Sequence, residues 1–308
     1  MNKFFKDISL ISMPLIMWSV FVLLIDPFNY FDFMSLISRD IKERNSKKLN
    51  GILYNIIDYC HEPCENLIIG DSRIESLPIN EIENVSGEKY KILALGSAKL
   101  NELFDLVYFS NTKIKLKHVV IGINFSLLNE YSFADRVPYV KEILKNPLKY
   151  IFNKNIAQAC YYVIKAKLTG ENVTSIPPMS REEFWQYWLT QKAFDWYGKY
   201  RYSEKLNNDL LALDNFAKEN NIKLTLIIVP LNTEFRNKLV EFGLSKEENR
   251  FKTTLGKLSA TVIDYDYENA ITNNKDYFSD PAHYNSYVAH LIINEVWKNS
   301  LIIGRRLK

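Results

Sequence analysis

The sequence predicts an α/β protein: a three-layer sandwich whose central parallel sheet is covered by helices on both faces. Amphipathic helical patterns, such as residues 203–220, alternate with short apolar runs, and this alternation indicates a parallel sheet. The runs are almost uninterrupted, as in strands that are buried on both faces. They lie at residues 67–70, 90–96, 118–124, 223–230 and 260–265.

The composition is that of a folded globular chain. It has 308 residues, of which 47% are hydrophobic and 24% charged. These values allow a sizeable core and exclude disorder as a description of the whole chain. The net charge of +3 is small, and no basic stripe with interleaved aromatic residues is present. We therefore expect no nucleic-acid partner.

The N-terminus carries an uncharged segment, residues 8–25, after Lys3 and Lys6. A helix of that length spans about 27 Å, close to the hydrocarbon thickness of a bilayer. No small-residue cleavage site follows, which favours an uncleaved transmembrane anchor over a signal peptide. We predict a membrane anchor over residues 1–28, with the rest of the chain outside the cytoplasm. The charged runs at 42–48 and 305–308 are expected to be solvated or near lipid headgroups.

The remaining chain divides into a linker with an amphipathic helix, residues 29–64, and an α/β domain, residues 65–308. One stretch of about a hundred residues, between Asn124 and Lys223, is too long for a single crossover. We predict a helical insertion there, at about 127–200. Its three tryptophans are interpreted as buried anchors, with the lining of a substrate groove as the alternative; they are Trp185, Trp188 and Trp196.

Three cysteines are present, two of them close together. Cys60 and Cys64 lie in C-H-E-P-C and are expected to form a local disulfide or to stay thiols. No second ligand cluster accompanies them, so we predict no metal site. Cys160 falls on an apolar helical face and is expected in the core.

Polar residues gather where the predicted strands end. The first strand runs into Gly70-Asp71-Ser72-Arg73, the second ends at Gly96 and the third at Asn124. Ligands bind at the carboxyl ends of parallel strands, so we expect these residues along one edge of the sheet. Residues 280–283, D-P-A-H, follow late in the chain.

These residue types fit acyl transfer through a serine. A serine hydroxyl needs an adjacent base, and histidine in turn needs a carboxylate to fix its tautomer. Ser72 is therefore predicted as nucleophile, His283 as base and Asp280 as its partner. The Ser72 N–H, the Gly96 N–H and the Asn124 amide are predicted donors to the oxyanion. The alternatives are a helix N-cap for Ser72 and a strand-ending turn residue for Asn124.

Two neighbours of Ser72 stay open. Asp71 is expected to cap the following helix rather than to touch substrate. Arg73 either binds a carboxylate or phosphate of the substrate or pairs with Glu75 or another acid.

These blocks, in this order, resemble the SGNH hydrolase superfamily, also called GDSL-like. G-D-S is Gly70 to Ser72, the second-block glycine is Gly96, and D-x-x-H is Asp280 to His283; the family's G-x-N-D is G-I-N-F here, ending on Asn124. The resemblance implies a flavodoxin-like, five-stranded parallel sheet. It also implies a serine esterase with the roles given above and no cofactor.

The N-terminal span, the D-P-F-N that follows it, G-D-S-R, the insertion and the final D-P-A-H-Y are similar to a membrane-anchored branch of that superfamily. This branch includes relatives of the D-alanine transfer protein of teichoic acids and of alginate-type polysaccharide O-acetylation proteins. It implies acyl transfer to or from cell-envelope glycans beside a membrane-bound O-acyltransferase.

Three readings of function remain. Water as the acceptor gives an esterase, and a sugar hydroxyl gives an O-acyltransferase. The alternative class is a non-catalytic scaffold that binds glycan or the acyltransferase. A phosphate-binding module is disfavoured because the chain lacks a glycine-rich loop.

Overall fold

The computed structural model describes residues 2–33, 36–173 and 179–307, with side chains from residue 12 onward. The chain forms two compact units. The helical unit comprises residues 1–62 and 136–177, and the α/β unit comprises residues 63–135 and 178–308. The stretch predicted as an insertion is thus divided between the two units.

The α/β unit is built on a six-stranded sheet in the order β2-β1-β3-β4-β5-β8. The first five strands are parallel, in the flavodoxin-like order, and β8 pairs antiparallel with β5. The strands of this sheet are β1 (Asn66–Gly70), β2 (Lys91–Ala94), β3 (His118–Ile123), β4 (Lys223–Ile228), β5 (Thr261–Asp264) and β8 (Arg305–Arg306).

The predicted α/β fold with a mostly parallel sheet is confirmed, but the predicted number of five strands is wrong. The sixth strand, β8, has two exposed charged residues and lies at the edge of the sheet. An edge strand buries no continuous apolar face, so β8 has no apolar run from which the sequence could predict it. Its Arg305 donates to the buried Asp264 carboxylate at 2.8 Å, so this arginine is not simply solvated.

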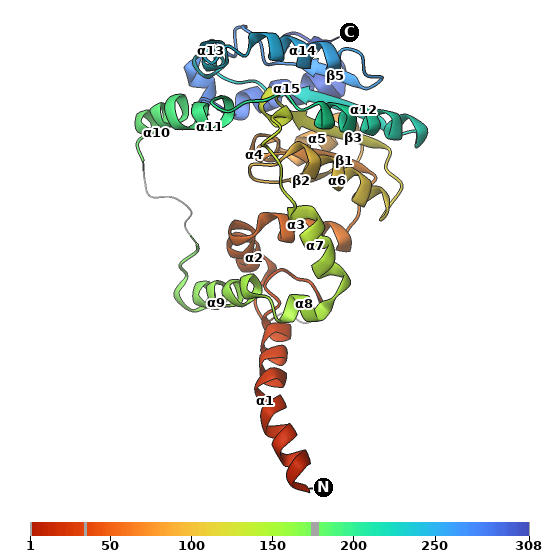
Figure 1. The fold of residues 1–308 in the computed structure, drawn as a ribbon, viewed down its shortest axis with the longest axis vertical. Coiled ribbons are helices and arrows are strands. Elements are labelled where there is room, and N and C mark those ends of the chain that lie inside the picture. Colours follow the sequence, from red (N-terminus) through yellow and green to blue (C-terminus); the bar gives the residue numbers. More distant parts are fainter. Residues whose placement is uncertain (1, 34–35, 174–178, 308) are drawn as a thin grey trace. The chain divides into compact units, whose positions relative to one another are not determined.

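Helices cover both faces of the sheet, as expected for a three-layer sandwich (Figure 1). Ile68, Val120 and Ile227 pack on one side with residues of α5 and α15. On the other side α6 contacts β1 and β3, and α12 contacts β4. The helices of this unit are α4 (Ser72–Glu75), α5 (Ile79–Ser86), α6 (Leu100–Asn111), η2 (Phe125–Leu128), α10 (Arg181–Tyr187), η3 (Trp188–Lys192), α11 (Ala193–Tyr197), α12 (Glu204–Glu219), α13 (Thr233–Glu241), α14 (Ser245–Leu255), η4 (Lys275–Tyr277) and α15 (Ser286–Lys298).

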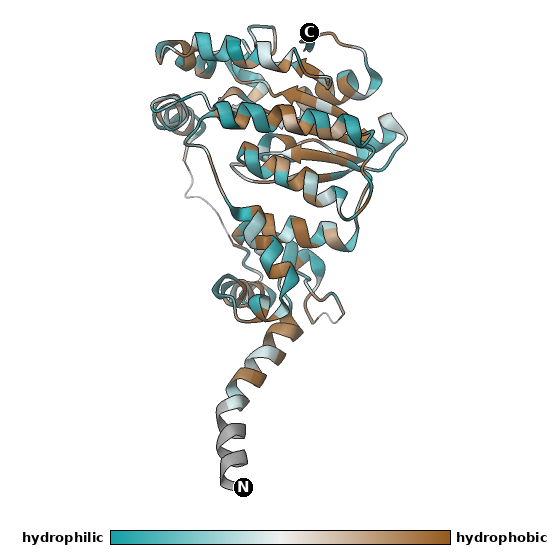
Figure 2. Cartoon of the chain, turned by 45° about the vertical axis from the view of Figure 1, so that its right-hand side comes forward, coloured by the Kyte–Doolittle hydropathy of each residue, from teal (hydrophilic) through white to brown (hydrophobic). Residues whose placement is uncertain are grey.

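The core explains why these runs form strands. Every residue of β1 and β3 is buried. Figure 2 shows the central strands mostly in the hydrophobic colour, whereas the helices carry both colours. A second, two-stranded sheet pairs β6 (Phe278–Asp280) with β7 (His283–Tyr284). This hairpin comes just before α15.

The helical unit is formed by two separate stretches of chain, one N-terminal and one from the middle of the sequence. Its core includes Leu53, Ile56 and Val140, from α3 and α7. Its helices are α1 (Asn2–Ile25), α2 (Arg39–Lys42), the π-helix η1 (Glu43–Lys47), α3 (Gly51–His61), α7 (Arg136–Lys145), α8 (Pro147–Ile151) and α9 (Lys154–Thr169).

A buried carboxylate organises the turn after α1. Asp26 is 1% exposed and has a positive φ of 39°. It accepts hydrogen bonds from the backbone of Tyr30, Phe31 and Asp32 and from the Tyr150 hydroxyl. Nearby, Lys42 is 1% exposed and donates to the Asn29 side chain at 2.9 Å. The expectation that the whole run 42–48 is solvated is therefore wrong for Lys42, because an oxygen partner compensates its burial.

Within the described residues, no helix combines the length and the apolar character needed to cross a membrane. The transmembrane helix predicted over residues 8–25 is therefore not found there, and residues 8–11 of that span lie outside the described side chains. The end of α1 packs inside the protein instead. Val22 and Ile25 are buried, and the Trp18 indole donates to the Ile151 carbonyl at 2.9 Å.

The cysteines are thiols in the structure, so the local disulfide considered for Cys60 and Cys64 is not formed. Cys160 is fully buried in α9, as its apolar face predicted. Burial raises the pKa of its thiol to about 12, which makes it an inert core side chain.

Candidate active site

Ser72 is the first residue of α4, directly after β1 and the Asp71 cap. The turn is tight: a Cβ added at Gly70 would lie 2.5 Å from the Ile74 Cγ1 atom. A side chain at residue 70 would therefore force Ile74 to shift where the strand passes the helix. The N-cap of α4 is Asp71, whose Oδ1 accepts from the Arg73 N–H at 3.0 Å. The capping role considered for Ser72 thus belongs to Asp71, as expected for that residue.

The structure brings Ser72, His283 and Asp280 into one hydrogen-bonded chain. Ser72 Oγ lies 2.8 Å from His283 Nε2. His283 Nδ1 lies 2.8 Å from Asp280 Oδ2 and 2.9 Å from Oδ1. A carboxylate only accepts hydrogen bonds, so Nδ1 carries the proton and Nε2 presents a lone pair to the serine hydroxyl. This is the arrangement that a serine nucleophile requires.

The β6–β7 hairpin holds the carboxylate in place. Asp280 Oδ1 also accepts from the backbone N–H groups of Ala282 and His283, at 2.9 and 3.0 Å. Asp280 is 5% exposed. Its orientation is therefore set by the same four-residue turn that carries His283.

Of the three predicted oxyanion donors, Asn124 and Gly96 differ in their position relative to Ser72. Asn124 is 1% exposed and lines a cavity that also contacts Ser72 and His283. Its Oδ1 caps η2 by accepting from the Ser126 N–H at 3.0 Å, so Nδ2 is the end of this amide that can donate to a substrate. Gly96 is exposed in the turn after β2 and is not among the lining residues, whereas its neighbour Ser97 is.

Arg73 pairs with Asp71 rather than with Glu75. Its Nε donates to Asp71 Oδ1 at 3.0 Å, and its Nη2 donates to Oδ2 at 2.5 Å. Burial raises the pKa of Asp71, but the guanidinium outweighs it and holds that pKa below its usual range. Burial likewise lowers the pKa of Arg73, and the Asp71 carboxylate outweighs it, so Arg73 stays charged while 2% exposed. Its guanidinium lies 5.6 Å from the centre of the Trp196 ring.

The cavity has a volume of about 710 Å³ and opens beside the serine–histidine pair. The tryptophans of the predicted insertion divide between the two roles considered. Trp185 is a buried anchor, fully enclosed, with its Nε1 donating to Glu234 at 2.7 Å. Trp188 and Trp196 line the cavity, and Trp188 meets the His283 ring edge to face at 5.7 Å.

Sequence reasoning left several lining residues out of the site. Ser97 has a positive φ of 52°, which follows from a turn that no motif marks. The others come from segments without strand-end signals, and only their aromatic and charged character hinted at a surface role. They include Tyr131, Lys192, Asp195 and Lys199.

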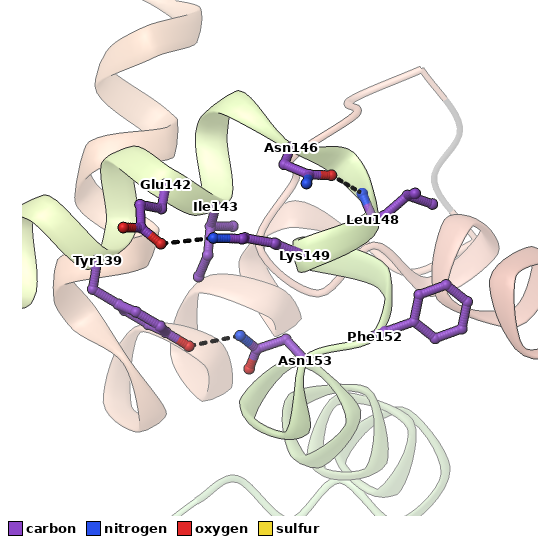
Figure 3. A pocket seen from close by; sticks show the side chains of 8 residues that line it. All are labelled: Tyr139, Glu142, Ile143, Asn146, Leu148, Lys149, Phe152 and Asn153. Carbon is purple, nitrogen blue, oxygen red and sulfur yellow. Dashed lines mark hydrogen bonds and ion pairs between the residues drawn. The ribbon is translucent and has the colours of Figure 1, made fainter.

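A second cavity, of about 480 Å³, lies in the helical unit between α7, α8 and the start of α9 (Figure 3). Its polar groups are paired with one another. Lys149 forms an ion pair with Glu142 at 2.7 Å, and Asn153 donates to the Tyr139 hydroxyl. Such internally paired groups offer no nucleophile or base, so we assign no chemistry to this cavity.

No cluster of three or more His, Cys, Asp or Glu that could hold a metal occurs in the described part of the chain. His118, outside the cavity, is a structural histidine. It is hydrogen-bonded to the Tyr90 hydroxyl at 2.7 Å and to Thr225 at 3.0 Å. Burial, aided by the Lys223 charge, lowers its pKa to about 4.

No family model and no curated protein matches this chain. Among the solved structures that match, a GDSL-like lipase from Bacteroides thetaiotaomicron is 10% identical, with a TM-score of 0.42, over 82% of this chain and 100% of that one. An acetyl xylan esterase is 11% identical, with a TM-score of 0.31, over 77% of this chain and 100% of that one. At these identities and scores the likenesses carry no weight, so the chemistry rests on this chain's own side chains.

Proposed function

We propose that the protein is a serine hydrolase that cleaves carboxylic esters through an acyl-enzyme on Ser72. The observation that carries this proposal is the chain from Ser72 Oγ to His283 and Asp280, opening on a cavity of about 710 Å³. Serine, histidine and carboxylate together meet the requirements for activating a hydroxyl at neutral pH.

The reaction proceeds in two halves. Ser72 Oγ attacks the ester carbonyl while His283 Nε2 takes the hydroxyl proton. The C–O bond to the leaving alcohol breaks, and His283 returns the proton to that alkoxide. Water then attacks the acyl-enzyme by the same route, releasing the acid and restoring Ser72. The Asn124 amide and the Ser72 N–H, which belong to residues that line the cavity, are the proposed donors to the oxyanion.

The finer assignment follows from the resemblance to the membrane-anchored SGNH branch. We propose acyl esters of cell-envelope polysaccharide as the substrate, with a membrane-bound O-acyltransferase as partner. A glycan hydroxyl in place of water would make the second half-reaction a transfer. The aromatic walls of the cavity, Trp188 and Trp196, are suited to sugar rings and support a glycan as substrate or acceptor. Adding an oligosaccharide to the acyl-enzyme and measuring ester product against free acid separates transfer from hydrolysis.

Attachment to a membrane through α1, with the α/β unit outside the cytoplasm, belongs to the same proposal. Met13, Ile16 and Met17 on α1 are more than half exposed, which supports a lipid contact for this helix. Co-sedimentation of the full chain with lipid vesicles tests this. Loss of co-sedimentation is expected when the three residues are replaced by serine, and equal sedimentation of both proteins would contradict attachment through α1.

Intact mass spectrometry tests the central claim. The purified protein is incubated with p-nitrophenyl acetate, and we expect a mass increase of one acetyl group located on Ser72. Ser72→Ala should show no adduct and lose ester hydrolysis by about 10³-fold or more. Equal hydrolysis by the wild type and by a folded Ser72→Ala variant would overturn the nucleophile. It would leave the non-catalytic scaffold as the better description.

A further inference from the structure

One segment of α1 is exposed on every side. Residues 13–17 are consecutive, all apolar and all exposed. Because successive residues of an α-helix are turned by about 100° around its axis, five in a row point in every direction. A helix that is apolar all round belongs in an apolar environment, and here that environment is not the protein. This segment therefore has the character of a helix that lies among lipid tails.

Packing of α1 begins at the next residue, Trp18, and it begins on α8. The Trp18 indole donates to the Ile151 carbonyl, and α1 contacts α8 and α9 where it leaves the helical unit (Figure 1). Tryptophan is also the residue that membrane interfaces prefer. If residues 13–17 lie in the hydrocarbon layer, this contact places α8 at the surface of that layer.

Apolar side chains are exposed on α8 and on its C-cap as well. Leu148 and Phe152 are both more than half exposed, and both line the second cavity (Figure 3). Leu148 lies one helical turn before Ile151, and Phe152 directly follows it. These side chains therefore extend the apolar surface of α1 onto α8, and an exposed apolar surface of this kind indicates a partner that covers it.

The charge of this part of the chain identifies that partner. Residues 136–169, which contain α7, α8 and α9, carry seven basic residues and one acidic residue, whereas the whole chain has a net charge of only +3. Three exposed lysines lie close to the apolar side chains in the sequence: Lys145, Lys149 and Lys154. Apolar side chains flanked by lysines are typical of surfaces that bind anionic lipid headgroups. A soluble polyanion would match the lysines but would leave the apolar segment of α1 uncovered.

We propose that α8 and its flanking residues form a second membrane contact, which seats the helical unit on a bilayer that contains anionic lipids. Its apolar side chains enter the boundary between headgroups and acyl chains, and its lysines meet the headgroups. We call this the α8 surface; it consists of Lys145, Leu148, Lys149, Phe152 and Lys154. The inference rests on the proposed attachment through α1 and is independent of the proposed ester cleavage. It adds a second site of attachment and a lipid class.

The experiment places an environment-sensitive dye on the α8 surface of the full chain. Cys60 and Cys64 are first replaced by serine, while Cys160 is buried and stays. Acrylodan is then attached at Leu148→Cys or, as the matched control in the α/β unit, at Val240→Cys; the two native side chains are 62% and 61% exposed. The protein is floated with vesicles of phosphatidylcholine and phosphatidylglycerol. We expect the emission of the floating fraction to shift to the blue with the dye at residue 148 and not at residue 240.

Lipid composition tests the lysines. In vesicles with phosphatidylglycerol, the lipid concentration that gives half of the shift at residue 148 should be about tenfold lower than in phosphatidylcholine alone. Replacing Lys145 and Lys154 together by glutamate should remove this preference. The matched control replaces Lys246 and Lys257, exposed lysines of the α/β unit, and should keep it. Equal affinity for both lipids, or the same loss in both double variants, would contradict the headgroup contact.

The proposals fail in different ways. A protein that floats without a shift at residue 148 would overturn the α8 surface and keep the attachment through α1. Equal shifts at residues 148 and 240 would also overturn it, because the contact would not be specific to α8. A protein that does not float would overturn both the α8 surface and the attachment through α1. None of these results changes the test of ester cleavage, which depends on the acyl adduct at Ser72.

Discussion

Asp26 in the helical unit and Asp280 in the α/β unit are both buried carboxylates that organise a turn, and the two are used differently. Asp26 in the helical unit is 1% exposed and Asp280 in the α/β unit is 5% exposed. Asp26 accepts four hydrogen bonds, from three backbone N–H groups and the Tyr150 hydroxyl, at 2.8 to 3.1 Å. All these donors are backbone groups or a buried side chain, so the carboxylate stabilises a turn and its hydrogen bonds do not connect it to a reactive group.

Asp280 also accepts from two backbone N–H groups, but its remaining donor is an imidazole. The other nitrogen of that ring holds the Ser72 hydroxyl at the wall of a cavity. A buried carboxylate is therefore structural by default. It becomes part of a reaction only where its hydrogen bonds lead to a group that substrate can reach.

The largest effect on activity is expected from replacing Asp280, the carboxylate that is connected to the serine. In Asp280→Asn the amide can face His283 with a donor, which favours the wrong imidazole tautomer and removes the negative charge. We expect kcat for ester hydrolysis to fall by about 10³- to 10⁴-fold, while KM stays within a few-fold. Steady-state kinetics measures both. A loss below tenfold would mean that Asp280 does not orient the base.

The matching change in the helical unit is Asp26→Asn. Asparagine tolerates the positive φ of this position but presents a donor where Phe31 and Asp32 both donate. We expect the helical unit to lose about 3–5 kcal/mol of stability, read as faster hydrogen exchange of its amides. Ester hydrolysis per folded molecule should not change.

Lys149→Ala is the control for that experiment. Lys149 belongs to the same unit and forms an ion pair with Glu142 (Figure 3). Both side chains are more than half exposed. We expect no measurable change in hydrogen exchange, because exposed ion pairs contribute little. If Asp26→Asn changed hydrogen exchange as little as Lys149→Ala, the hydrogen bonds of Asp26 would not stabilise the helical unit.

A smaller effect, in the α/β unit, concerns pH and His118. Its folded pKa of about 4 lies below the ordinary value of 6.5, so the unfolded state takes up the proton first as pH falls. The contribution of His118 is full above pH 6.5 and is lost as pH falls toward 4. The shift corresponds to about 3 kcal/mol.

Asp266 acts in the opposite direction. Burial raises its pKa to about 6, so its protonation stabilises the folded state as pH falls through that value. The wild-type curve alone therefore mixes two opposing effects. The difference in unfolding free energy between wild type and His118→Gln isolates the histidine: it should narrow by about 3 kcal/mol between pH 6.5 and 4. A constant difference across that range would contradict a neutral, buried His118.

Much of the fold could be predicted because buried strands appear as apolar runs in the local sequence. The five parallel strands are covered on both faces, so each appears as an apolar run. β8 was missed because two charged residues at a sheet edge carry no such pattern. The division of residues 127–200 between two units was not readable either, since both parts are helical and aromatic and differ only in what they pack against.

For the site, the sequence by itself determined the chemistry that was available. Gly70-Asp71-Ser72 and the D-P-A-H turn are local signals, and a carboxylate three residues before a histidine meets it within one turn. Ser72 and His283 are 211 residues apart in the sequence. Only the tertiary structure, through the order of the strands in the sheet, brings them within hydrogen-bond distance.

The tertiary structure also decided what surrounds the serine. It paired Arg73 with Asp71, and it made one tryptophan an anchor while two others became cavity walls. Sequence could not make these choices, because a side chain's partner depends on which elements share a surface. The sequence therefore determined the type of reactive groups, and packing determined which of them meet and which donors remain for a substrate.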